Sequence, residues 1–126
     1  MKRSLGAACV ALLAGCNGII NGTCTLIGCS SGLIVNLAQA PAGAYKIEVF
    51  SGPDGPRYVF DCAGAAQCGT SAMFTDYTPA SVTIRVTTSA GTREQTAEPT
   101  YSINRPNGPD CGPECKQGQV TVALPG

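Results

Sequence analysis

Short segments in which apolar and polar residues alternate one by one constrain the fold of this chain more than any other feature. In SVTIRVTT, which begins at Ser81, valine or isoleucine occupies every second position, and threonine or arginine lies between them. AYKIEVF, from Ala44, and QVTVAL, from Gln119, repeat the pattern. A period of two with β-branched residues is typical of a half-buried β-strand. We therefore predict three strands, and in the first of them we expect Ile84 to face inward and Arg85 outward.

Four further segments are strand candidates, and turn signals separate them. GLIVNLA and PRYVFDC have denser apolar residues and predict strands that are packed more fully, whereas SAMFTDY and PTYSINR are weaker candidates. Glycine and proline mark turns at APAG, GPDGP, YTPA, SAG and RPNGPDCGP. Residues 32–126 are therefore expected to form one all-β domain of about seven or eight strands, a small β-sandwich of Ig-like or transthyretin-like architecture.

The beginning of the chain has a different character. Lys2 and Arg3 precede an uncharged, mostly apolar stretch that ends in LAGC. This stretch is about a dozen residues long, whereas about 20 are needed to span a bilayer. A positive head, a short apolar segment and small residues before a cleavage point are the layout of a secretory signal. The segment resembles the signal peptide of bacterial lipoproteins, whose lipobox would here be Leu13-Ala14-Gly15-Cys16.

The resemblance implies that residues 1–15 are removed, that the Cys16 thiol receives a diacylglycerol group and that the new amine is acylated. Residues 16–31 would then be the lipidated N-terminus and a tether. Two or more acyl chains bind a bilayer stably, so Cys16 would anchor the exported protein to the bacterial membrane. Asn17 after the cysteine favours the outer membrane if the host is Gram-negative. An ordinary cleaved signal peptide and a short buried helix are the alternatives.

Six of the eight cysteines remain once Cys9 and Cys16 are assigned to the signal and the lipid. An even number outside the cytoplasm predicts three disulfides that brace the domain. The close spacing favours three local bridges, although a sandwich can also join distant loops. CGPEC resembles a redox motif, but its gap is one residue too long and a strand follows, so a structural bridge is preferred. The favoured pairs are Cys24–Cys29, Cys62–Cys68 and Cys111–Cys115.

Composition argues against several classes of function. The chain has no histidine, which rules out Ser-His-Asp and Cys-His nucleophiles and argues against zinc. Of its eight basic residues, Lys2 and Arg3 belong to the predicted signal, so six basic residues face eight acidic ones. Without a basic patch, nucleic acid is not an expected partner. No catalytic residue, metal or cofactor is predicted.

A few polar and aromatic residues remain as candidates. Asp54 with Asp61, and Glu94 with Glu98, are carboxylate pairs of the kind that hydrolyse glycosides. We interpret Asp54 as a turn residue, and the acids near Glu94 as charges on an exposed edge. The two lysines outside the predicted signal, Lys46 and Lys116, are expected on solvated faces. Three of the four tyrosines are candidates for a sugar- or peptide-binding platform, but core or edge packing is the preferred interpretation; they are Tyr58, Tyr77 and Tyr101.

Three functional hypotheses follow. The first is a non-catalytic envelope or surface module that binds an envelope protein or a glycan, or supports an assembly. The alternative is an inhibitor of a hydrolase, a protease or a lysozyme, that uses the loop RPNGPDCGPEC. An enzyme is the least favoured of the three.

Overall fold

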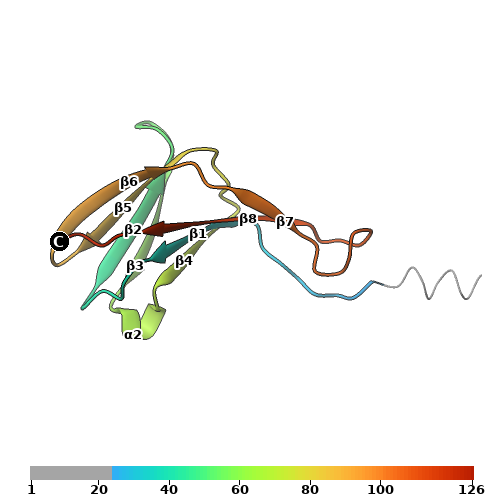
Figure 1. Cartoon of the computed structure of the whole chain (residues 1–126), viewed down its shortest axis with the longest axis horizontal. Helices are drawn as coiled ribbons and strands as arrows, with labels where there is room; N and C mark the ends of the chain where they lie inside the picture. Colours follow the sequence, from blue (N-terminus) through green and yellow to red (C-terminus); the bar gives the residue numbers. More distant parts are fainter. Residues whose placement is uncertain (1–23) are drawn as a thin grey trace, which may run out of the picture. The chain divides into compact units, whose positions relative to one another are not determined.

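The computed structural model describes residues 24–126, which form an all-β fold with one short helix (Figure 1). The predicted signal peptide and the lipidation site Cys16 lie outside the described residues, and the predicted tether is described only from Cys24. In chain order the elements are β1 (Gly32–Leu37), β2 (Tyr45–Phe50), β3 (Arg57–Cys62), α2 (Ala65–Cys68), β4 (Ser71–Thr75), β5 (Val82–Thr88), β6 (Gly91–Ala97), β7 (Tyr101–Asn104) and β8 (Cys115–Val122).

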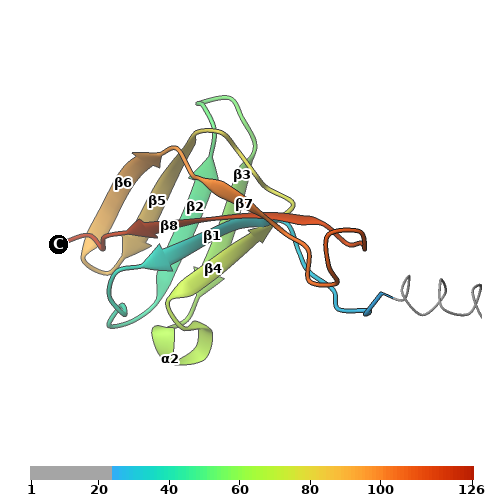
Figure 2. The ribbon, with the colours of Figure 1, turned by 45° about the vertical axis from the view of Figure 1, so that its right-hand side comes forward.

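The eight strands form two four-stranded sheets that pack face to face (Figure 2). One sheet, called sheet A, has the strand order β4-β1-β8-β7, and the other, called sheet B, has the order β3-β2-β5-β6. All neighbours are antiparallel except β1 and β8, which run parallel. Both sheets belong to one compact unit, Cys29–Asn104 with Glu114–Gly126. The predicted disulfide-braced β-sandwich is therefore confirmed.

The core lies between the sheets and consists of every second residue of the central strands. In β5, Val82, Ile84 and Val86 are at most 1% exposed, and the residues between them are partly exposed. β2 alternates in the same way, and β1 buries its inward side chains as the dense GLIVNLA segment predicted. The other main core residues, which come from β1, β2, β4 and β8, are Leu33, Val35, Leu37, Tyr45, Ile47, Val49, Ala72, Phe74 and Val122.

Two elements of sheet B differ from the sequence prediction. The segment PRYVFDC was expected to be packed more fully, but β3 is an edge strand in which Tyr58 is 43% and Val59 50% exposed. That prediction is wrong because residue composition does not specify whether a strand has one neighbour or two. The opposite edge, β6, was not among the strand segments identified by alternation, although Glu94 was interpreted as a charge on an exposed edge. Its sequence GTREQTA has almost no apolar residue and stays mostly exposed.

The disulfide pairing also corrects the prediction. Cys62–Cys68 is local, as expected, and encloses α2. The other two bridges are long-range, Cys24–Cys111 and Cys29–Cys115, whose partners are 87 and 86 positions apart in the sequence. For Cys29 the reason is the parallel pairing of β1 with β8, which aligns Gly32 with Gln117. The segments that lead into both strands therefore start at the same end of sheet A, and their cysteines meet.

A second compact unit is described for residues 24–28 and Arg105–Pro113. The Cys24–Cys111 bridge closes it, and the Asn107 side chain links its two segments. The Asn107 Oδ1 atom accepts hydrogen bonds from the Thr25 hydroxyl at 2.5 Å and the Ile27 N–H at 2.9 Å. Its Nδ2 atom donates to the carbonyl oxygens of Ile27 and Gly112, both at 2.8 Å. Residues Arg105–Pro113 are thus fixed by one asparagine and one disulfide.

Candidate binding surface

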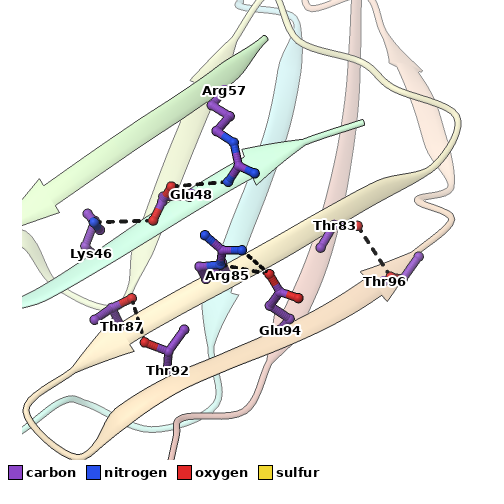
Figure 3. Close-up of polar contacts among 9 residues, drawn as sticks. All are labelled: Lys46, Glu48, Arg57, Thr83, Arg85, Thr87, Thr92, Glu94 and Thr96. Carbon is purple, nitrogen blue, oxygen red and sulfur yellow. Dashed lines mark hydrogen bonds and ion pairs between the residues drawn. The ribbon is translucent and has the colours of Figure 1, made fainter. Parts of the chain in front are cut away.

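The outward face of sheet B collects charged and hydroxyl side chains in aligned rows (Figure 3). The register of its four strands sets these rows, because residues directly opposite each other in an antiparallel pair share a face. We call this surface the sheet B face. Its three rows, read from β3 to β6, are Asp61, Lys46, Thr87, Thr92; then Val59, Glu48, Arg85, Glu94; then Arg57, Phe50, Thr83, Thr96.

Arg85 and Glu94 form the best-defined polar contact of the middle row. The Arg85 Nε atom donates to Glu94 Oε1 at 2.8 Å, and the Nη2 atom donates to the same oxygen at 2.5 Å. The side chains are 33% and 48% exposed, respectively. Water screens a pair at this exposure, so the pair orients its partners more than it stabilises the fold.

On the β3 side of the face, Glu48 accepts two cations. Its carboxylate lies 3.3 Å from Lys46 Nζ and 3.5 Å from an Arg57 guanidinium nitrogen. Only 13% of the Glu48 side chain is exposed, whereas Lys46 and Arg57 are about 40% exposed. Glu48 is thus shared by two cations, and Asp61, opposite Lys46 on the same face, balances their remaining charge.

Phe50 lies beneath the arginines. It has the outward register of Lys46 and Glu48, yet it is only 8% exposed. The Arg57 Cζ atom is 3.9 Å from the ring centroid, and the Arg85 Cζ atom is 5.6 Å away. An arginine over an aromatic face is attracted by the ring quadrupole. The Phe50 ring therefore helps to hold two guanidinium groups in place on this face.

Threonine pairs complete the face on the side of β6. Thr83 and Thr96 have hydroxyl oxygens 3.5 Å apart, and those of Thr87 and Thr92 are 3.3 Å apart. They lie in the rows above and below Arg85–Glu94, as Figure 3 shows. Opposed threonines and opposite charges are favourable cross-strand pairs. The result is a surface of ordered donors and acceptors on a rigid sheet.

The polar residues singled out from the sequence lie in different elements and turns of the fold. Glu94 is occupied by Arg85, and Glu98 is an exposed residue just beyond the end of β6. Asp54 lies exposed in the turn between β2 and β3, as interpreted from the sequence, while Asp61 is on β3 opposite Lys46. The Nζ atom of Lys116 lies 4.9 Å from the centroid of the Tyr101 ring.

The tyrosines pack against one another and against backbone. The rings of Tyr58 and Tyr77 are 4.7 Å apart, and the Tyr77 and Ser51 hydroxyls are 3.0 Å apart. The Tyr101 hydroxyl donates to the Pro79 carbonyl at 2.6 Å. Burial, and to a smaller extent the charge of an ionised Tyr77, raise the pKa of Tyr101. These contacts support the packing interpretation, although Tyr58 keeps 43% of its surface exposed.

Sequence reasoning placed Arg85 on this face but missed Phe50. The signal was present, because in YKIEVF the phenylalanine keeps the outward register of Lys46 and Glu48. The neighbouring arginines, which cover the ring, come from β3 and β5. Sequence alone could not bring the two residues together, because the pairing of β2 with both strands was not known.

Within the described part of the chain there is no pocket and no cluster of metal-ligating side chains. Among the same residues, no helix has the length and apolar character to cross a bilayer. Three disulfides are typical of a protein that folds in an oxidising compartment. The sheet B face is the candidate binding surface of the sandwich. No family model, no curated protein and no solved structure matches this chain.

Proposed function

We propose that this chain is a non-catalytic bacterial lipoprotein, anchored through lipid on Cys16, whose sandwich binds an envelope protein or a glycan through the sheet B face. The observation that carries the binding role is the pair of arginines held over Phe50, with Arg85 also fixed by Glu94. Arginine and aromatic residues dominate the energetics of many interfaces. Arginines that are already oriented lose less side-chain entropy when a partner binds.

The chemistry of the face favours a partner with acidic or hydroxyl groups. The guanidinium groups offer N–H donors in a planar fork that suits carboxylates. The threonine hydroxyls on both sides of Arg85 can donate and accept hydrogen bonds. An acidic protein surface or an acidic glycan satisfies both kinds of group.

Capture from envelope extract tests the binding role. We expect Arg85→Ala to reduce recovery of the partner about tenfold, because interface arginines often contribute more than 1 kcal/mol. Gln119→Ala is the matched control, since Gln119 lies on the outward side of β8 in sheet A. Equal losses in the two variants, or no loss in either, would contradict the assignment of the sheet B face.

The anchor is tested separately by labelling cells with a fatty-acid analogue. The motivation is the LAGC segment after a charged and then apolar leader. Cys16→Ser should abolish the label and leave the protein either uncleaved or soluble. Equal label on the variant and the parent chain would refute lipidation at Cys16, whatever the outcome of the capture experiment.

A second candidate function is inhibition of a hydrolase by the loop from Arg105 to Cys115. The observation that favours it is the bonding of Asn107, which fixes the loop through four hydrogen bonds. Rigid loops lose little entropy on binding, as in protease inhibitors. A panel of proteases and lysozymes assayed with the full chain tests this function. Inhibition by the parent chain that Asn107→Ala weakens would favour the loop over the sheet B face.

A further inference from the structure

The free edge of β3 carries a self-complementary sequence. β3 pairs with β2 on one side only and is the last strand of sheet B. From Arg57 to Asp61 it reads RYVFD, with a cation at one end, an anion at the other and three apolar residues between them. An exposed edge offers unpaired backbone N–H and C=O groups to another strand.

We propose that two copies of this chain associate through antiparallel pairing of their β3 edges, centred on Val59. A two-fold axis through Val59 places each residue opposite the one equally far on the other side, as in any isologous interface. Arg57 then faces Asp61 of the second copy on the outward side, twice by symmetry. Tyr58 faces Phe60 of the second copy on the inward side, and Val59 faces its own equivalent.

The exposure and charge of these residues fit the pairing. Val59 is 50% and Tyr58 43% exposed, which is high for apolar residues in a strand. Asp61 is exposed and lies opposite Lys46 of its own sheet. In the paired form the row would read Phe50, Arg57, then Asp61 and Lys46 of the second copy. Charges alternate along that row, and opposite charges directly across strands are favourable.

The other sheet edges described in residues 24–126 lack this complementarity. In β6, centring on Arg93 or Glu94 puts like charges together, and centring on Gln95 creates no ion pair. β4 and β7 carry no charged residue. β7 is also only four residues long, and Pro99 and Pro106 lie just outside its two ends. The β3 edge is thus the one described edge whose own sequence specifies a register with a second copy.

The proposed interface consists of one strand from each copy, so we expect a weak dimer whose population depends on concentration. Interfaces that bury less than about 1,200 Å² are typical of transient association. Confinement to a surface raises the local concentration of a protein. The inference itself does not rest on the lipid anchor, because the β3 edge is present whether or not the chain is acylated.

Cross-linking of the full chain tests the register. Opposed Cα atoms in an antiparallel pair lie about 4.5–5.5 Å apart, which a disulfide can span. Val59→Cys should therefore form a disulfide-linked dimer under mild oxidation, seen on a non-reducing gel and lost on reduction. The matched control is Thr96→Cys, an exposed outward position on the β6 edge. Equal cross-linking of the two variants, or none in either, would overturn the proposal.

Charge reversal on the Val59→Cys background provides the second test. Asp61→Arg replaces two attractive pairs by two repulsive ones and should lower the dimer fraction about threefold or more. The double reversal Arg57→Asp/Asp61→Arg restores opposite charges and should restore the dimer. Failure of the double reversal to do so in a chain with its native disulfides would overturn the register. If either reversal misfolds, Asp61→Asn removes the attraction without adding a cation, and an unchanged dimer fraction would count against the proposal.

Discussion

Ile84 and Arg85 are consecutive residues of β5 that face opposite sides of sheet B. Ile84 is fully buried, whereas Arg85 lies outward against Phe50 and Glu94. We expect Ile84→Ala to lower the free energy of unfolding by about 2–5 kcal/mol, because it removes buried surface and leaves a cavity. Arg85→Ala should cost about 1 kcal/mol or less, since its ion pair is exposed to water. Urea melts of the oxidised chain measure both, and a larger loss for Arg85→Ala would contradict the strand facing.

Tyr45 makes the stability of the sandwich sensitive to alkaline pH. Its ring is buried, its hydroxyl donates to the Gly69 carbonyl at 2.9 Å, and burial raises its pKa above 10.0. The unfolded chain therefore releases this proton at lower pH than the folded chain does. The stabilisation is complete below pH 10 and is lost as the pH rises through the folded pKa.

The matched variant is Tyr45→Phe, which should cost about 1 kcal/mol at neutral pH through the lost hydrogen bond. Above pH 10 its free energy of unfolding should fall less steeply than that of the parent chain. Tyr101 titrates in both proteins and so cancels in the comparison. Urea melts at a series of alkaline pH values give the two slopes, and parallel slopes would exclude Tyr45 as the group responsible.

The first residue of β1 shows how closely strands approach within sheet A. Gly32 has a φ of 153°, and a Cβ atom added there would lie 2.3 Å from the Phe74 carbonyl oxygen on β4. Gly32→Ala should therefore cost about 2 kcal/mol or more, since backbone must shift. Gly43→Ala is the control, because nothing lies within 4 Å of its Cβ position. Thermal melts compare the two, and similar melting temperatures would show that β1 and β4 separate easily.

The success of the sequence prediction varied with the position of each strand. β2 and β5 were predicted because each is central in sheet B and half-buried, which gives a period of two. β6 was missed because an edge strand that faces water needs few apolar residues, and its inward positions carry Arg93 and Gln95. Polar inward side chains also discourage further strand pairing at this edge. α2 escaped notice because four residues form a single turn, too short for helical periodicity.

For the molecule as a whole, the number of disulfides could be predicted, but of their pairings only the local one, Cys62–Cys68. An even count of cysteines indicates how many bridges form, whereas the pairing depends on which strands are neighbours. The parallel contact of β1 with β8 joins the two ends of the sequence, and no local pattern encodes it. The sheet B face could be predicted only in part from the sequence. The alternation of apolar and polar residues indicates which side chains point outward, but the order of the strands decides which of them meet.

The two long bridges should be partly redundant in stabilising the fold, because each shortens the loop that the other closes. Each closes a loop of 86 or 87 residues, which alone is worth about 4.5 kcal/mol in chain entropy. Once one is formed, the other closes only a ring of about ten residues through the short segments between the cysteines, worth about 2.5 kcal/mol. Removing Cys24–Cys111 or Cys29–Cys115 singly should therefore cost about 2.5 kcal/mol, and removing both about 7 kcal/mol.

The loss in free energy of unfolding on removing both bridges should thus exceed the sum of the two single losses by about 2 kcal/mol. Urea melts of variants in which both cysteines of a bridge are replaced by alanine measure these losses. Alanine is used rather than serine because Cys115 is buried and a hydroxyl there would add its own cost. The local bridge Cys62–Cys68 is the internal control, because its loop of six residues is separate and its removal should add to either long one. The losses in free energy of unfolding from removing the two long bridges could instead simply add, as the loss from removing Cys62–Cys68 should. In that case the two bridges do not share a loop, and the long-range pairing is wrong.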